Sequence, residues 1–196
     1  MTRKYLCPLQ TRWGAIDLLD IRLEDIDVSD IAYSLAHQNR YTGHASPPVN
    51  VAAHSIACSI VAPPEYAFEA LMHDAHEAYL GDINGQVKSA LRSIDDFEWT
   101  CLDELEERLR LAVAQKFGLP RQVSETVEEI DLRMLQTERL RAMHRSADHL
   151  WPSLESAPPY YRILGILESS AADAQQEFTY RVFLLAAGHP NQFDVD

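Results

Sequence analysis

The spacing of apolar and polar positions along this chain is helical over most of its length. From Ser29 onward, apolar residues recur three and four positions apart, which is typical of amphipathic helices. Residues 12–24 alternate loosely instead and predict a short β-hairpin at the edge of the domain. The predicted helices cover residues 28–40, 49–62, 66–80, 95–117, 126–146 and 170–187.

Capping residues set the predicted helix boundaries. Ser29 is expected to cap the first helix, and Thr126 with Glu129 resembles a capping box at the start of the fifth. The Pro63–Pro64 pair closes the second helix, since proline cannot continue one. Because no repeat or linker-like stretch divides the chain, residues 1–196 are predicted to form one all-α domain, a helical bundle with a short N-terminal β-hairpin.

Composition and charge narrow the class of protein. A chain of 196 residues with 46% hydrophobic and 24% charged residues is ordinary for a globular domain with a real core. Its 30 acidic and 17 basic residues give a formal net charge of −13, which repels a polyanion. Extended binding of DNA or RNA is therefore disfavoured. A small anionic ligand stays compatible with this charge if a metal or a few arginines reverse its sign locally.

The chain shows no sign of export or of membrane insertion. No stretch approaches the ~18 apolar residues that cross a bilayer, and the first residues lack the apolar core of a secretory signal. The cysteines Cys7, Cys58 and Cys101 are odd in number and far apart, which indicates reduced thiols and neither disulfides nor a cysteine zinc site. We therefore expect a cytoplasmic protein with no membrane partner.

The stretch "LMHDAHEAYLGD", residues 71–82, concentrates costly polar groups in an apolar-rich segment. At about 100° per residue on a helical wheel, Glu77 lies about 40° and Asp74 about 100° from His73, opposite the apolar arc. A solvated polar face is the ordinary explanation for such charges. An adjacent His-Asp pair with a glutamate three positions later is unusual enough to suggest partners elsewhere in the chain.

Two further polar residues share helix faces with apolar ones. A lone histidine such as His54 is more often a satisfied core residue than a ligand. Asp131 falls within the apolar stripe of its helix, where an ionised carboxylate needs a metal, an arginine or a backbone amide as partner. Together with His73 and Asp74, these residues make a mixed nitrogen and oxygen ligand set suited to Zn²⁺, Mn²⁺, Co²⁺ or Fe²⁺.

This H…HD…D pattern resembles the signature of the HD-domain metal-dependent phosphohydrolases. The segment "HDAHEAYLGDINGQVK" is similar to the H-D-x-x-E-x-x-x-G-D-x-x-x-x-x-K segment of HD-domain 5′-deoxynucleotidases. The related deoxynucleoside triphosphate triphosphohydrolases, including the small phage-type dATP enzymes, share it. "NRYTGHASPPVNVAAHS" resembles their arginine-aromatic pair ahead of the first metal histidine, and "EIDLRMLQTE" resembles the segment bearing the last aspartate. The resemblance covers about residues 17–140.

The resemblance implies an HD-domain helical bundle with one divalent metal site. We favour Zn²⁺, Co²⁺ or Mn²⁺ as the metal, with Mg²⁺ as a further alternative. The family pattern also implies a homo-oligomer, either a dimer or a hexamer. The residues that match the family's metal ligands are His54, His73, Asp74 and Asp131.

Catalytic and substrate-binding roles follow from the same resemblance. It implies a catalytic role for Glu77 and places Asp82 near the sugar or the attacking water. Arg40 and Lys88 match the residues that contact phosphate. Tyr41 stands where well-known deoxynucleotidases have tryptophan, which leaves the discrimination between sugars open.

The expected function is metal-dependent hydrolysis of deoxynucleotides, with a small-molecule substrate. A purine dNTP triphosphohydrolase that converts dATP to deoxynucleoside and triphosphate is favoured. A 5′-deoxynucleotidase acting on monophosphates is the first alternative, and a metal-dependent nucleotide sensor without turnover is the second. Gln38 is a candidate for reading a base edge, with an ordinary surface glutamine as the simpler interpretation.

Overall fold

A computed structural model describes residues 5–95, 98–144, 154 and 157–189 of the chain. At the N-terminal end, strands β1 (Pro8–Gln10) and β2 (Ala15–Asp17) pair in antiparallel fashion, with Leu9 opposite Ile16. The predicted hairpin therefore exists, but its strands lie within residues 8–17 and not along residues 12–24. A tight turn joins the strands, in which the backbone amide of Thr11 donates to the Gly14 carbonyl. The first strand therefore ends before residue 12, where the predicted hairpin began.

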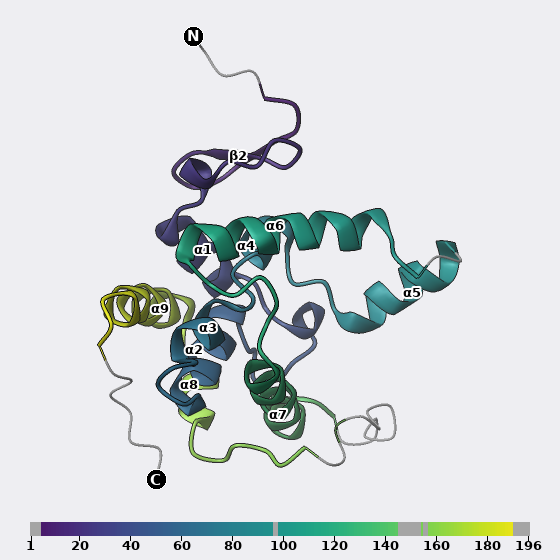
Figure 1. The fold of residues 1–196 in the computed structure, drawn as a ribbon. Helices are drawn as coiled ribbons and strands as arrows, with labels where there is room; N and C mark the ends of the chain where they lie inside the picture. Colours follow the sequence, from purple (N-terminus) through teal and green to yellow (C-terminus); the bar gives the residue numbers. More distant parts are fainter. Residues whose placement is uncertain (1–4, 96–97, 145–153, 155–156, 190–196) are drawn as a thin grey trace.

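The rest of the described chain is mainly helical, as Figure 1 shows, which confirms the predicted all-α class with a short hairpin. Two short 3₁₀ turns, Leu23–Asp25 and Tyr41–Gly43, accompany the helices. Among the described residues, none of the helices combines the length and the apolarity that crossing a bilayer requires. The helices are α1 (Val28–His37), α2 (Val51–Val61), α3 (Ala67–Met72), α4 (Glu77–Leu80), α5 (Gly85–Asp95), α6 (Cys101–Phe117), α7 (Glu125–Ala142), α8 (Leu164–Leu167) and α9 (Ala171–Ala186).

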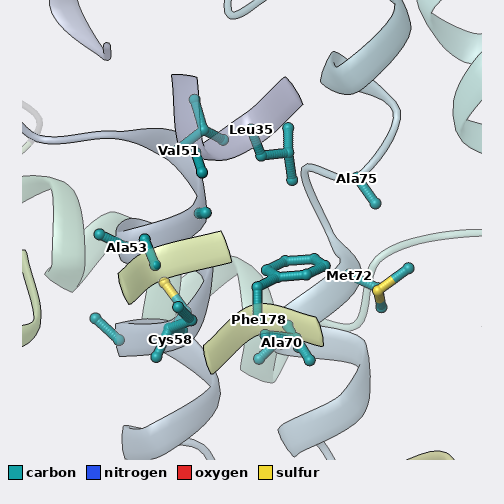
Figure 2. Close-up of a cluster of buried hydrophobic side chains, with 14 of the residues drawn as sticks. Leu35, Val51, Ala53, Cys58, Ala70, Met72, Ala75 and Phe178 are labelled. Atoms are coloured by element: carbon teal, nitrogen blue, oxygen red, sulfur yellow. The ribbon is translucent and has the colours of Figure 1, made fainter. Parts of the chain in front are cut away.

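Helix α2 lies at the centre of the packing. Residues 51–60 are all buried, and α1, α3, α7, α8 and α9 each contact this helix. Figure 2 shows the apolar cluster around it, where Phe178 from α9 packs among side chains of the helices α1 to α3. Complete burial of such an aromatic side chain stabilises a fold by about 1.5–3 kcal/mol. The backbone of α2 is therefore held in place by apolar packing against five other helices.

The prediction of one continuous helix over residues 66–80 is wrong. Helix α3 ends at Met72 and α4 begins at Glu77, and residues 73–76 form a turn between them. Its hydrogen bonds run from the Ala75 amide to the Met72 carbonyl and from the Glu77 amide to the Asp74 carbonyl, each 3.0 Å long. This spacing of three residues is that of a tighter 3₁₀ turn. His73 and Asp74 therefore lie on a turn between two short helices.

At two helices the N-cap is a different residue from the predicted one, two positions earlier in the chain. Asp27, and not Ser29, caps α1, because the Asp27 carboxylate accepts from the Ser29 amide. Ser124, and not Thr126, caps α7 by accepting from the Val127 amide. Asp, Ser and Thr are all good N-caps, so a run of such residues does not reveal which one adopts the extended backbone of a cap.

The predicted helix over residues 95–117 begins later than expected, and a separate helix precedes it. Helix α6 starts after Thr100, which forms a capping box with Asp103, and it ends before Gly118, which adopts the left-handed conformation. Helix α5 lies where no helix was predicted. Its apolar residues Val87, Leu91 and Ile94 recur at helical spacing, but they are exposed and do not join the core.

Candidate metal centre and cavity

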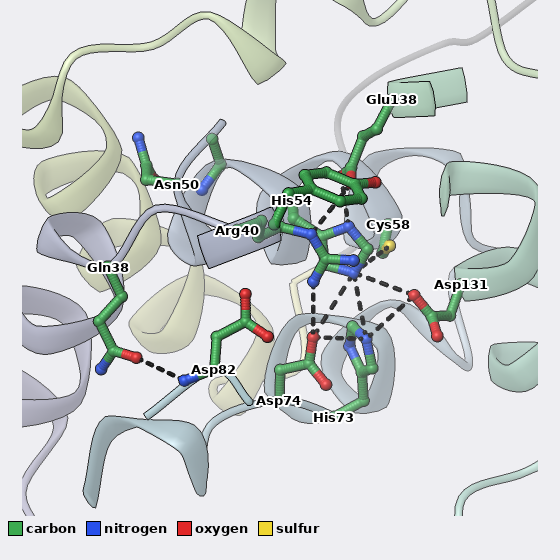
Figure 3. A network of polar contacts seen from close by, with 12 residues as sticks. Gln38, Arg40, Asn50, His54, Cys58, His73, Asp74, Asp82, Asp131 and Glu138 are labelled. Carbon is green, nitrogen blue, oxygen red and sulfur yellow. Dashed lines mark hydrogen bonds and ion pairs between the residues drawn. The ribbon is translucent and has the colours of Figure 1, made fainter. Parts of the chain in front are cut away.

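Three separate parts of the fold bring the four predicted metal ligands together (Figure 3). His54 comes from α2, His73 and Asp74 from the turn after α3, and Asp131 from α7. The two imidazole Nε2 atoms lie 3.4 Å apart. The Asp131 Oδ1 atom lies 3.1 Å from Nε2 of His54, and the Asp74 Oδ2 atom lies 3.2 Å from Nε2 of His73.

Each of these histidines has its other ring nitrogen engaged by an acceptor. Nδ1 of His54 donates to the Glu138 carboxylate over 2.6 Å, and Nδ1 of His73 donates to the Ala70 carbonyl over 2.9 Å. A neutral imidazole carries only one N–H, so this arrangement leaves the lone pair on Nε2. Both lone pairs therefore face the carboxylate oxygens of Asp74 and Asp131, which are also electron-rich.

The pKa shifts of these groups show that the cluster favours positive charge at its centre. Burial lowers the pKa of His73, but the adjacent Asp74 carboxylate outweighs it and the pKa of His73 lies well above its usual value. Burial and Arg40 lower the pKa of His54, yet Glu138 and Asp131 help to raise it well above normal. Burial raises the pKa of Asp131, and its bonds to the two imidazoles bring that pKa well below normal. A divalent cation would supply that charge while keeping both imidazoles neutral.

The cluster also contains a residue that was not predicted to belong to the metal site. Cys58 lies one helical turn after His54, and its Sγ atom is 3.6 Å from Nε2 of that histidine. One ligand atom from each of His54, Cys58, His73 and Asp131 lies within 4.8 Å of the others. This group could therefore hold a metal ion.

Glu138 is the second residue that was missed. It is fully buried, and besides His54 it accepts hydrogen bonds from the Tyr41 hydroxyl over 2.6 Å and from Nε of Arg40 over 3.0 Å. Burial raises the pKa of Glu138, but Arg40 and His54 more than compensate, so its pKa is lowered and the group is ionised. Its spacing of seven residues from Asp131, two helical turns along one face of α7, was the available signal.

A cavity of about 300 Å³ opens beside the cluster. Glu106 also lines this cavity and forms an ion pair with Lys88. Among the described residues Gln38 does not line this cavity. The predicted site residues that do line it are Arg40, Tyr41, Asp74, Glu77, Asp82, Lys88 and Asp131.

Glu77 and Asp82 present carboxylates to this cavity. Glu77 is 8% exposed, and among the described residues no group hydrogen-bonds its Oε2 atom. Burial raises the pKa of Glu77 well above its normal value, and the neighbouring Asp74 and Asp82 carboxylates raise it further. The pKa of Asp82 is also raised, mainly by burial. Glu77 is therefore able to hold or release a proton beside the metal cluster.

The basic residues of the cavity are each tied to a carboxylate. Nε of Arg40 contacts Glu138, and Nη1 of Arg40 lies 3.5 Å from the Asp74 carboxylate. Nζ of Lys88 lies 2.5 Å from the Glu106 carboxylate. Both cations are thus positioned before any ligand arrives.

The side chains of Tyr41 and Gln38, predicted to bind substrate, both form hydrogen bonds within the protein. Tyr41 is 6% exposed, and its hydroxyl is used by Glu138, although the residue still borders the cavity. The Gln38 side chain accepts from the Asp82 amide over 2.9 Å and donates to the Glu77 carbonyl over 3.1 Å. Gln38 therefore holds the two ends of α4 in place. Its predicted contact with a base stays a prediction.

Comparison with known proteins gives a family but no activity. No protein-family model matches the chain. Over 138 residues it is 41% identical to YfdR of Escherichia coli K12, which covers 70% of this chain and 72% of YfdR. The chain belongs to the same family as YfdR. It is also 36% identical over 114 residues to RCAP_rcc00048 of Rhodobacter capsulatus, which covers 54% of this chain and 55% of that protein. Both relatives are named as uncharacterized proteins, so the site itself must carry the functional argument.

The role of Glu138 leads to a prediction about metal affinity. The substitution Glu138→Gln keeps the shape and an acceptor for His54 but removes the charge that orients the imidazole. We expect the affinity for Zn²⁺ or Co²⁺ to fall by about 10–100-fold, as is typical when the partner of a metal-bound histidine is changed. Calorimetric titration of metal into the metal-free protein measures this.

The matched control is Glu129→Gln, on the same helix with a side chain that is 72% exposed, which should leave affinity unchanged. Circular dichroism establishes that both variants are folded. Wild-type affinity in a folded Glu138→Gln protein would show that the charge on Glu138 does not support the metal site.

Proposed function

We propose that this protein is an HD-type metal-dependent phosphohydrolase that cleaves deoxynucleotides. One observation carries the proposal. The Nε2 atoms of two histidines converge with the carboxylates of Asp74 and Asp131. These two carboxylates line a cavity that also presents Glu77, Arg40 and Lys88. A metal site, a carboxylate available for proton transfer and two cations for phosphate are the groups that hydrolysis of a phosphate ester requires.

His54, His73, Asp74 and Asp131 are the proposed metal ligands, and the donor set favours Zn²⁺, Co²⁺ or Mn²⁺, with Mg²⁺ as the alternative. When bound, the metal would neutralise charge on a phosphate oxygen and acidify a coordinated water. The second ring nitrogens of the two histidines are already occupied, so the rings need no rearrangement to present Nε2. This preorganisation supports the assignment.

Glu77 is the proposed general base. Its side chain reaches the cavity, and its Oε2 atom lacks a hydrogen-bond partner among the described residues. A carboxylate in this position can orient the attacking water and accept its proton. Burial and the Asp74 and Asp82 carboxylates raise the pKa of Glu77, which makes its carboxylate a stronger base. Asp82, on the same cavity wall, is placed to hold the water or the sugar.

Arg40 and Lys88 are the proposed phosphate contacts. A guanidinium carries five N–H donors, so the bonds of Arg40 to Glu138 and Asp74 do not exhaust it. Lys88 can exchange its ion pair with Glu106 for one with a phosphate oxygen. Because the cavity lining also includes several carboxylates, a nucleotide should bind there only together with the cation.

The favoured reaction is the conversion of dATP to deoxyadenosine and triphosphate. Water would attack the α-phosphorus, while the β- and γ-phosphates extend toward Arg40 and Lys88. Tyr41 borders the cavity with its ring fixed by the bond to Glu138, so it can pack on a deoxyribose and exclude a 2′-hydroxyl. The alternatives remain a 5′-deoxynucleotidase and a nucleotide sensor without turnover, in each case as a homo-oligomer.

A first prediction separates chemistry from binding. Glu77→Gln keeps the side-chain shape and removes the base, so metal and nucleotide should still bind while turnover falls by about 10²-fold or more. Single-turnover rates and equilibrium binding of dATP measure the two effects separately. Glu65→Gln, an exposed position just before α3, is the control and should behave as wild type. Undiminished turnover in Glu77→Gln would remove this residue from the mechanism.

A second prediction concerns the bond that is broken and the sugar. With dATP and Co²⁺, chromatography should detect deoxyadenosine and intact triphosphate, and ATP should react about 10–10²-fold more slowly. Tyr41→Ala should narrow that preference because the ring is lost, whereas Tyr41→Phe should retain it. First products of dADP and orthophosphate would contradict attack at the α-phosphorus. Hydrolysis of dAMP but not dATP would favour the 5′-deoxynucleotidase.

A further inference from the structure

We infer that Cys58 is a metal ligand, which adds a sulfur atom to the histidine and aspartate ligands of the site. The inference rests on the metal site of the proposed function but not on its reaction. The sulfur belongs to the same compact group as His54, His73 and Asp131. Figure 3 shows Cys58 beside the imidazoles, on the side of the cluster away from Asp82.

The distances match those within a four-coordinate site. With metal–nitrogen bonds of about 2.0–2.1 Å and a metal–sulfur bond of about 2.3 Å, tetrahedral ligands lie about 3.3 Å (N to N) and about 3.5 Å (N to S) apart. The two Nε2 atoms are 3.4 Å apart, and Sγ of Cys58 is 3.6 Å from Nε2 of His54. Asp131 Oδ1 lies 3.1 Å and 3.8 Å from the two nitrogens. These four separations fit a single cation, and the other pairs, from Sγ of Cys58 to His73 and to Asp131, lie within 4.8 Å.

The position of Cys58 on the buried helix α2 places its thiol beside His54. His54 and Cys58 are four residues apart, so they occupy one face of the helix, and both are fully buried. The packing around α2 prevents the thiol from turning toward solvent. Its Sγ atom lies 3.6 Å from the Nε2 atom of His54, whose other ring nitrogen is bonded to Glu138.

Asp74 differs from the other proposed ligands because it also contacts a cationic side chain. Its Oδ2 atom approaches both imidazoles but also lies 3.5 Å from Nη1 of Arg40. Asp74 can therefore remain bound to the metal as a further ligand or be drawn toward Arg40, while Cys58, His54, His73 and Asp131 keep the ion in place.

A sulfur ligand changes which metals the site prefers. Binding breaks the S–H bond, the proton passes to solvent, and the sulfur lone pair forms the bond to the cation. Thiolate ligands favour Zn²⁺ and Co²⁺ over Mn²⁺ and Mg²⁺, which prefer oxygen. The wild-type protein should therefore prefer Zn²⁺ over Mn²⁺ more strongly than a variant without the thiol, by about tenfold or more.

Cobalt spectroscopy tests the inference on the full-length protein. Titration of Co²⁺ into metal-free protein should produce a near-ultraviolet charge-transfer band from a cobalt–thiolate bond, saturating at one ion per chain. In Cys58→Ser and in Cys58→Ala, whichever folds, Co²⁺ should still bind but the band should be lost. Cys101→Ser, at an exposed position of α6, should keep the band.

The outcomes separate this inference from the proposed hydrolysis. A cobalt-loaded wild-type protein without the charge-transfer band, or a Cys58→Ser protein that retains it, would overturn the role of Cys58. If such a protein still cleaves deoxynucleotides, the proposed function stands and only the sulfur ligand is wrong. A band that depends on Cys58 in a protein without phosphohydrolase activity would support the sulfur ligand and contradict the proposed function.

Discussion

The site depends on one buried hydrogen bond, from Nδ1 of His54 to the Glu138 carboxylate. Both partners are fully buried, one on α2 and one on α7, so this contact fixes the imidazole tautomer and joins the two helices at the same time. In the neutral ring, donation from Nδ1 leaves the lone pair on Nε2. The same carboxylate holds Arg40 and Tyr41 at the edge of the cavity.

The apolar core and the polar cluster are therefore two aspects of one arrangement. Helix α2 is surrounded by apolar packing, which would make a lone histidine costly. Glu138 offsets that cost on one side of the ring, and a cation held at Nε2 would offset it on the other. The tight turn between α3 and α4 then brings His73 and Asp74 to the same point. A cation held there would give an acidic protein a locally positive site.

Much of this could be predicted from the sequence, because local patterns carry it. Helical periodicity predicted the class of fold, and the H…HD…D spacing identified the residues that meet in the cluster. Glu138 was missed although it lies two helical turns from Asp131, because only the packing of α7 on α2 shows that it is buried. The break after Met72 also escaped prediction, because a 3₁₀ turn and an α-helix share nearly the same backbone angles.

Anomalous X-ray scattering from crystals of the cobalt-loaded protein, collected on both sides of the cobalt absorption edge, tests the central claim most directly. The account predicts one strong anomalous peak at about 2.0–2.2 Å from Nε2 of both His54 and His73 and from an oxygen of Asp131. A peak elsewhere in the molecule, or none at the cluster with both imidazoles bonded directly to the carboxylates, would contradict it.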